Sequence, residues 1–239
     1  MGDMAALWSY LSTEPLLWLT ATLLAYLAAA QLARALGTPP WANPVLMAVL
    51  ILAPVLWATS TPYATYFEGA QFIHFLLGPA TVALALPLYD NLPTIRKTVL
   101  PIVAALLVGS VVAAVSAIGL ARAFGLAPAV ILSLAPKSTT APVALGIAEA
   151  IGGLPSLTAV LVILTGIVGA VTVTPLMNAL RITDWRARGF AVGVAAHGIG
   201  TARAFQVHPQ AGAYAGIALA LNAVLTSLLV PLLVRVLLP

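Results

Sequence analysis

Long apolar runs dominate this chain and decide what it can fold into. A helix needs about 20 apolar residues to cross a bilayer. Five runs reach or approach this length, the second being rather short: Leu16–Leu36, Pro44–Thr59, Val99–Phe124, Leu157–Leu180 and Gly212–Val236. Only 7% of the 239 residues are charged, whereas soluble domains carry about a quarter. The chain could not cover a globular surface with polar groups, so we predict an integral membrane protein with an all-α fold.

Three further apolar segments are interrupted by proline, glycine and polar residues: Gln71–Tyr89, Pro128–Ala150 and Phe190–Phe205. Together with the five runs they predict a polytopic membrane helix bundle of about eight elements, several of them broken or re-entrant. We treat residues 1–239 as one integral membrane domain, with N-terminal helices in 1–62 and a core in 67–239.

The composition also excludes several classes of protein. The chain has no cysteine, which excludes disulfides, zinc–thiolate sites and thiol catalysis. Its first basic residue, Arg34, follows the first apolar run, so Leu16–Leu36 indicates a retained helix and not a secretory signal. Ten basic residues, mostly in short loops, are better explained by membrane orientation than by nucleic acid. We find no catalytic, metal-binding or nucleotide-binding signature, and expect neither an enzyme nor a cofactor.

A few ionisable residues stand inside the apolar segments instead of at their ends. Lys137, Glu149 and Arg203 are the charged ones, and His74 and His197 join them. A charge at bilayer depth costs several kcal/mol, so such residues normally face a cavity or a partner. We interpret His74 as a packing residue and keep the other four as candidates for a functional site.

The first candidate site is the polar break Pro136–Pro142. Its two prolines interrupt the helix, and the backbone groups that are freed must find partners inside the protein. The N-terminus of the following half-helix attracts anions, and Lys137 adds a full positive charge. Three hydroxyls can cap that terminus: Ser138, Thr139 and Thr140. A simple kink is the alternative interpretation.

The second candidate site is His197–Arg203. Gly198 and Gly200 allow close approach of the backbone, and Thr201 can cap a half-helix. His197 and Arg203 are hydrogen-bond donors, and arginine suits two-pronged recognition of a carboxylate.

We predict that the two breaks face each other near the middle of the membrane and bind a small organic anion, as broken helices do in transporters. His197 and Glu149 are candidates for binding a coupling proton, because histidine titrates near neutral pH. Hydrogen-bonded packing is the alternative for His197, and an interfacial position or a pairing with Lys137 is the alternative for Glu149.

The broken segments also suggest internal repeats and a topology. Phe75–Leu84 and Leu132–Leu145 share a polar break, a Val-Ala-Leu ending and a later Leu-Pro turn, and Val194–Arg203 resembles them more loosely. The basic loops fall on one side of the membrane, as cytoplasmic loops do, if Pro128–Ala150 enters and leaves on the same side. A continuous, unwound crossing helix is the alternative.

Four motifs in this order resemble the LrgB/CidB family of bacterial membrane proteins. They are Leu77–Ala85 (LGPATVALA), Pro136–Pro142 (PKSTTAP), Ile151–Val160 (IGGLPSLTAV) and His197–Ala204 (HGIGTARA). The resemblance runs from about Phe72 to the C-terminus. Two positions depart from the family pattern: Ala141 and Ala196 stand where the family often has a hydroxyl.

The resemblance implies two functions, between which the sequence decides only in part. Members are called antiholin-like or are linked to murein hydrolase export and cell lysis, usually with a small LrgA- or CidA-like partner. The plant plastid glycolate/glycerate transporter contains a similar domain, and some bacterial relatives are linked to pyruvate uptake. We favour a carrier of small 2-hydroxy or 2-oxo monocarboxylates in the bacterial inner membrane, working as a homo-oligomer, because intramembrane cations are costly unless they are used.

Overall fold

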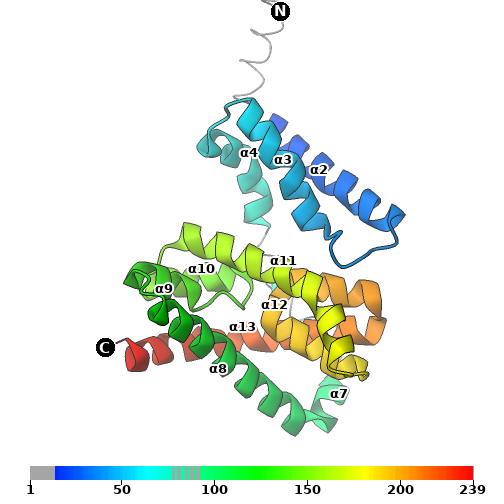
Figure 1. Ribbon diagram of the computed structural model, residues 1–239, viewed down its shortest axis with the longest axis vertical. Coiled ribbons are helices and arrows are strands. Elements are labelled where there is room, and N and C mark those ends of the chain that lie inside the picture. The colour runs from blue at the N-terminus through cyan, green and yellow to red at the C-terminus, as the bar shows by residue number, and fades with distance from the viewer. Residues whose placement is uncertain are drawn as a thin grey trace, which may run out of the picture. The chain divides into compact units, whose positions relative to one another are not determined.

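The computed structural model describes residues 14–76 and 92–238, together with positions 79, 82, 83, 86 and 89. Every regular element among them is a helix, which confirms the all-α prediction. The chain divides into two compact units, Met1–Ala80 and Thr81–Pro239, which are described separately below (Figure 1). The description of 1–239 as one domain stays a prediction.

The described residues of the first unit form three helices: α2 (Pro15–Ala35), α3 (Pro44–Ala58) and α4 (Tyr63–Phe75). Trp18 of α2 is buried and meets the Tyr66 ring edge-on at 6.1 Å. Gly69 lies against the backbone of α2, where a Cβ would come within 2.2 Å of the Pro15 carbonyl oxygen. These aromatic and close-packed contacts explain why α4 begins at Tyr63, well before the apolar segment Gln71–Tyr89 predicted from the sequence.

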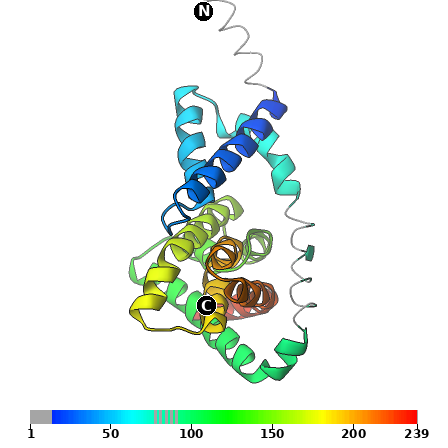
Figure 2. The ribbon, with the colours of Figure 1, turned by 90° about the vertical axis from the view of Figure 1, so that its right-hand side faces the viewer.

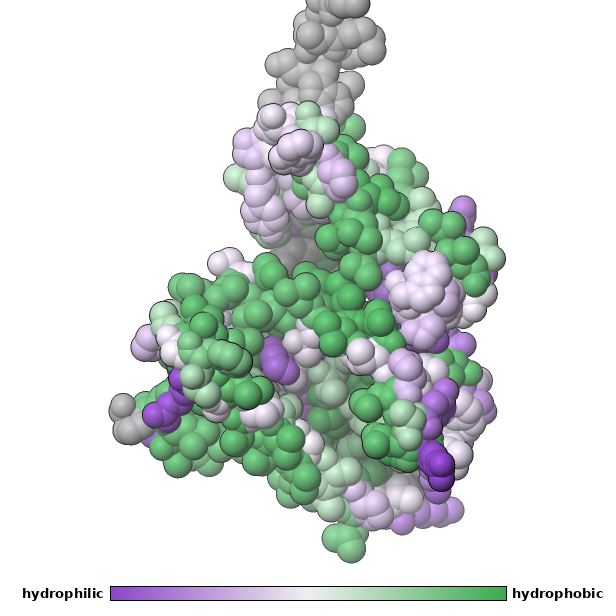
Figure 3. All heavy atoms as spheres, viewed as in Figure 1, coloured by the Kyte–Doolittle hydropathy of each residue, from purple (hydrophilic) through white to green (hydrophobic). Residues whose placement is uncertain are grey.

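The described residues of the second unit form long helices that cross one another, together with shorter helices. In chain order they are α7 (Leu92–Lys97), α8 (Val99–Ala123), α9 (Pro128–Leu134), α10 (Ala141–Ala150), α11 (Pro155–Ala179), α12 (Trp185–Val207) and α13 (Pro209–Leu237). Among the described residues of both units, four helices are long and apolar enough to span a membrane: α2, α8, α11 and α13. They match four of the five predicted runs, whereas the fifth, α3, has 15 residues and is shorter. The visible face of the second unit is mostly apolar, with polar side chains gathered mainly at its margins (Figure 3).

Pro128–Ala150 folds back on itself, and we call it hairpin 1. It consists of α9, the turns at 135–140 and α10. A Cβ on Gly153 would lie 3.0 Å from the Ser133 backbone nitrogen, and the Leu154 N–H donates to Ser133 Oγ at 2.8 Å. In a continuous helix, positions 132 and 153 would be about 30 Å apart. The geometry is therefore that of the re-entrant alternative, not of a continuous crossing helix.

Helix α12 also reverses direction, and we call Trp185–Val207 hairpin 2. Its dihedral angles are non-helical at Ala196 and His197. Val192 and Gly200 would be about 12 Å apart in a straight helix, yet a Cβ on Gly200 would lie 2.7 Å from Val192 Cγ2. The rings of Trp185 and His208 stack at 4.8 Å. The segment is thus a second hairpin whose two ends lie together.

The two hairpins enter the unit from opposite ends. Thr98 and Asp184 line one cavity, which places the start of α8 beside the start of hairpin 2. We call this the basic end, because five basic residues lie at or next to it: Arg96, Lys97, Arg181, Arg186 and Arg188. At the opposite end, Arg122 donates to the Leu237 carbonyl, and hairpin 1 follows α8 there. In Figure 2, α13 is seen nearly end-on, with segments of the other helices around it.

This arrangement is an inverted repeat. Hairpin 1 is followed by α11, and hairpin 2 by α13, and both long helices begin with a proline, Pro155 and Pro209. The repeat is therefore clear for Val194–Arg203, the segment whose sequence resembled the other two only loosely. Half of the positions of Phe75–Leu84 fall outside the described residues. Inverted repeats of broken helices are typical of secondary transporters.

Candidate functional site

The tips of the two hairpins meet near the middle of α13. Asn222 of α13 is 1% exposed, and its Nδ2 donates to the Ser138 carbonyl in hairpin 1 and to the Val194 carbonyl in hairpin 2, at 3.2 Å in each case. One amide nitrogen thus bridges the two breaks. The prediction that the breaks face each other agrees with this geometry.

The other side of the Asn222 amide is equally occupied. Its Oδ1 accepts from Ser110 Oγ of α8 at 2.7 Å and from Thr226 Oγ1 at 3.0 Å. Both hydroxyl residues are buried. An asparagine side chain has two donor hydrogens and an oxygen with two lone pairs, so its hydrogen-bonding capacity is fully used. Asn222 therefore joins α8, both hairpins and α13.

A cavity of about 540 Å³ lies beside this junction. Lys137 and Ser138 of hairpin 1 supply its polar groups together with Thr165 of α11. The remaining lining is apolar and comes from α8, hairpin 1, α11 and hairpin 2: Gly109, Val112, Ala113, Leu134, Leu161, Leu164, Val168, Gly169 and Ala195. The Lys137 Nζ donates to Ser138 Oγ at 3.2 Å. One ammonium group in an apolar chamber can attract one negative charge.

The hydroxyls of the hairpin 1 tip do not act as caps. Thr140 is the N-cap residue of α10 by position, but its side chain makes no capping hydrogen bond, which corrects that part of the sequence interpretation. Thr139 is fully buried, and its Oγ1 has no hydrogen-bond partner among the described residues. The first turn of α10 therefore has backbone N–H groups that no N-cap side chain satisfies.

His197 is the strained residue of the hairpin 2 tip. Its φ of 40° and ψ of −136° lie in a region that side chains other than glycine rarely adopt. The ring is buried and Nε2 lies 2.9 Å from the Val162 carbonyl oxygen of α11. A carbonyl only accepts, so Nε2 carries the hydrogen and Nδ1 is left to take up a proton.

The remainder of the predicted second break is helical. Only Ala196 and His197 leave the helical region, and residues 198–203 form the returning leg of hairpin 2. Thr201 Oγ1 donates to the His197 carbonyl at 2.8 Å, so it supports the tip. Gly200 packs against the Val192 backbone, whereas a Cβ on Gly198 would meet open space.

Arg203 lies apart from the 540 Å³ cavity. It is buried on the returning leg of hairpin 2, about 9 Å along the helix axis from His197. It lines a pocket of only about 20 Å³ with Thr174, Trp185 and Arg188, and its Nη1 donates to Gln206 Oε1 at 3.4 Å. In this structure Lys137 and Arg203 therefore do not line one cavity.

Glu149 is also distant from the tips. It is exposed on the last turn of α10, about 12 Å along the axis from Ala141 at the start of that helix. Among the described residues, the ion pair that forms is the one between Arg186 and Asp184, at 2.7 Å, and not one between Lys137 and Glu149.

A second cavity connects the basic end with the junction. It measures about 590 Å³ and begins between Thr98, Asp184 and Arg186. Gly109, Ala113 and Ala195 line both cavities, so the two adjoin. At the mouth, the hydrogen bond from the Arg186 side chain lowers the pKa of Asp184 below its ordinary value. The chamber with Lys137 thus adjoins a cavity that extends to the basic end.

Four polar residues of this site were not predicted from the sequence: Ser110, Thr165, Asn222 and Thr226. They lie in long apolar helices, where a hydroxyl or amide could equally face a neighbouring helix for packing. The signal that could have found Asn222 is that it is an amide placed near the middle of Gly212–Val236. The i,i+4 spacing places Thr226 on the same helix face as Asn222, but no spacing rule pointed to its partners on other elements.

Comparison with known proteins places the chain in one family. The LrgB-like family model matches residues 22–236. "Uncharacterized protein YxaC" of Bacillus subtilis is 37% identical over 213 residues, covering 89% of this chain and 92% of that protein. "Uncharacterized protein YwbG" of the same organism is 36% identical over 193 residues, covering 81% and 86%. "Holin-like protein CidB" of Staphylococcus aureus is 33% identical over 195 residues, covering 82% and 85%.

No solved structure matches the chain. The family match nevertheless covers both hairpins, the two cavities and the Asn222 junction. Four apolar helices among the described residues agree with the multi-pass membrane character of the matching proteins. The chain therefore belongs to the LrgB-like family of membrane proteins.

Proposed function

We propose that this protein is a carrier of small monocarboxylates that works by alternating access. The observation on which the proposal mainly rests is the junction of two oppositely inserted hairpins beside a chamber that contains Lys137. Transporters with inverted repeats bind substrate where broken helices meet near the midplane.

The chamber suits an anion with one negative charge. Lys137 supplies one ammonium group, and Ser138 and Thr165 supply hydroxyls. A second carboxylate would lie against Leu134, Leu161 and Leu164, where an unpaired charge is expensive. Substrates of the 2-hydroxy and 2-oxo monocarboxylate type, such as glycolate, glycerate and pyruvate, fit this chemistry. On this proposal the protein is a carrier and not an enzyme.

On this proposal, the chamber is open towards one end of the unit in the described state. The adjoining cavity leads to the basic end, between Thr98 and Arg186. Basic loops are cytoplasmic as a rule, so the described state is open to the cytoplasm of a cell whose inner membrane contains the protein. Opening to the other side would complete the cycle.

A second candidate function is holin-like regulation of murein hydrolase export and cell lysis. It is favoured by the name of the Staphylococcus aureus relative, "Holin-like protein CidB". A regulator of this kind would act with a small LrgA- or CidA-like membrane partner. It gives no reason for the polar junction around Asn222 or for an intramembrane lysine.

Uptake of labelled glycolate, glycerate and pyruvate into liposomes containing only this chain tests the proposal. We expect saturable uptake of at least one of them, competed by the other monocarboxylates and not by a dicarboxylate such as malate. Absence of saturable uptake of all three, with folded protein in the liposomes, would contradict the proposal.

A further inference from the structure

We propose that Asn222 is a positioning residue that holds α8 and both hairpin tips together as one body throughout the transport cycle. The inference rests on the proposed carrier function and goes beyond it, because it says which contacts stay closed while access alternates. It predicts that the two tips do not part to release substrate.

The hydrogen bonds of Asn222 make separation of the tips unfavourable. Four bonds converge on a side chain that is 1% exposed, and two of their acceptors are carbonyl oxygens of the tips, those of Ser138 and Val194. Parting the tips would leave the amide and these carbonyls without partners in apolar surroundings. Buried polar groups without partners cost much more than an average hydrogen bond contributes. A cycle that keeps the junction intact avoids that cost at every turnover.

Hairpin 2 and α13 pack closely against each other near the junction. A Cβ on Gly193 would lie 2.3 Å from the Ala215 carbonyl oxygen, and one on Gly189 would lie 2.0 Å from that of Ala211. The two backbones are therefore in contact at two positions about one helical turn apart. Such contacts allow movement of the pair as a unit more readily than sliding.

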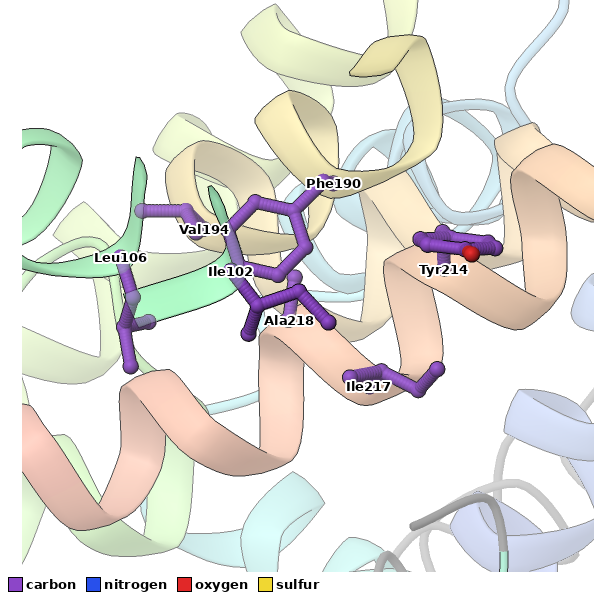
Figure 4. Close-up of a cluster of buried hydrophobic side chains, with 7 residues drawn as sticks. All are labelled: Ile102, Leu106, Phe190, Val194, Tyr214, Ile217 and Ala218. Atoms are coloured by element: carbon purple, nitrogen blue, oxygen red, sulfur yellow. The ribbon is translucent and has the colours of Figure 1, made fainter. Parts of the chain in front are cut away.

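An apolar cluster extends the same body to α8. It joins side chains of α8, hairpin 2 and α13 (Figure 4): Ile102, Leu106, Phe190, Val194, Tyr214, Ile217 and Ala218. Val194 belongs both to this cluster and, through its carbonyl, to the Asn222 junction. Polar and apolar contacts thus bind the same three elements.

Alternating access then has to come from elements outside this body. The Ser138 carbonyl is bonded to Asn222, so Ser138 and its neighbour Lys137 move with this body. Asn222 itself is saturated and so acts on the substrate through the position of these two residues, not by contact. Loss of the tip bonds should therefore weaken substrate binding specifically.

A disulfide between α8 and hairpin 2 tests whether the body stays closed. A Cβ on Gly109 would lie 4.0 Å from the Val194 Cβ, which is within the range for disulfides, and the natural chain has no cysteine. In Gly109→Cys/Val194→Cys we expect the disulfide to form and saturable uptake to continue in the oxidised protein. Uptake that is lost on oxidation and restored by reduction would overturn the proposal. The reduced double variant with both thiols capped by methylthio groups controls for added bulk.

A second comparison isolates the tip bonds. Asn222→Asp keeps the acceptor oxygen for Ser110 and Thr226 but loses the two donors to the tips, whereas Thr226→Val keeps both donors. We expect Asn222→Asp to raise KM for substrate, with kcat less affected, and to raise it more than Thr226→Val does. Equal kinetic effects of the two variants would show a merely structural role and contradict the proposal.

The yield of the cross-link separates this inference from the proposed function. If the wild-type chain shows no saturable uptake, the carrier proposal fails, but the Gly109→Cys/Val194→Cys disulfide can still be measured. We expect it to form almost completely, and to lose most of its yield when Asn222→Asp is added. A yield that does not respond to Asn222→Asp would overturn the role of Asn222 whether or not the protein transports.

Discussion

Lys137 shows how the surroundings of one residue define its use. Its ammonium group lies beside Ser138 in a chamber otherwise lined mainly by aliphatic side chains. A charge in such surroundings is costly unless it is paired. A carboxylate substrate would supply the pairing charge, which explains why the chain keeps a lysine there.

Substitution of Lys137 therefore gives the first prediction. Lys137→Gln removes the charge while keeping a polar side chain, and should lower kcat/KM for uptake by at least about tenfold, since a charge-assisted bond contributes about 1.5–3 kcal/mol. Lys97→Gln at the basic end is the matched control and should transport normally. Wild-type uptake by Lys137→Gln, measured in liposomes, would exclude Lys137 from the substrate site.

His197 gives the second prediction, which concerns coupling to protons. Its Nε2 is held by the Val162 carbonyl, so its Nδ1 is the ring nitrogen left to gain and lose a proton. We expect an inward proton gradient to stimulate uptake by the wild type and not by His197→Gln. His208→Gln, at the start of α13, is the control and should keep the stimulation. Stimulation that survives in His197→Gln would remove His197 from the coupling.

Single residues were predicted unevenly from the sequence. Charge inside an apolar run was enough to single out Lys137 and His197, because such charges are expensive wherever the chain folds. It could not tell that Arg203 would line a different pocket, since that depends on the hairpin reversing at Ala196 and His197. Asn222 was missed because an uncharged amide is cheap enough to occur in a packed helix without a special role.

At the scale of elements, the hairpins depend on glycines that let backbones touch. Gly193 of hairpin 2 lies against the Ala215 backbone, and the nearest atom is a carbonyl oxygen that cannot rotate away. Gly119 of α8 is a helical glycine with open space around its Cβ position. The two positions differ in packing while sharing a helical backbone.

These glycines give the third prediction. Gly193→Ala should force hairpin 2 away from α13 and lower the melting temperature in detergent, with a cost of about 1–3 kcal/mol for overpacking. Gly119→Ala should be neutral or stabilising by up to about 1 kcal/mol, because alanine favours helix. Equal melting temperatures for the two variants would argue against close contact between hairpin 2 and α13.

The positions of the helix breaks could be predicted, but the reversal of the chain at each break could be predicted only in part. Two prolines with hydroxyls between them indicated that Pro128–Ala150 is interrupted, and the distribution of basic loops favoured re-entry. Hairpin 2 has no proline at its tip; its reversal rests on the strained His197 backbone and on contacts such as Gly200 with Val192. Contacts between residues eight apart leave no periodic signal in a sequence.

At the scale of the whole second unit, the side of the membrane on which each end lies can be tested. Thr98 and Ala187 belong to the basic end, and Ala150 and Leu126 belong to the opposite end. Because the chain lacks cysteine, single cysteines can be introduced at these positions without further changes.

Labelling of these cysteines gives the fourth prediction. In intact cells, an impermeant thiol reagent should reach Leu126→Cys and Ala150→Cys but not Ala187→Cys, because basic ends face the cytoplasm. After permeabilisation, Ala187→Cys should also react. Opposite sidedness of positions 126 and 150 would show that Pro128–Ala150 crosses the membrane and would contradict the re-entrant hairpin.

The overall class of the protein was the part that the sequence predicted best. Apolar runs fixed four of the spanning helices to within a few residues, because length and hydropathy alone decide whether a helix can cross. The inverted arrangement emerged only from tertiary contacts, such as those joining Ser138, Val194 and Asn222.

The most direct test of the central claim measures saturable uptake and leakage in the same liposomes. Vesicles containing only this chain are loaded with a trapped fluorescent dye, and uptake of a labelled monocarboxylate is followed together with dye release. We predict saturable uptake with the dye retained, and loss of that uptake in Lys137→Gln. Unsaturable entry of the carboxylate accompanied by release of the dye would contradict the carrier account and favour a lesion-forming, holin-like protein.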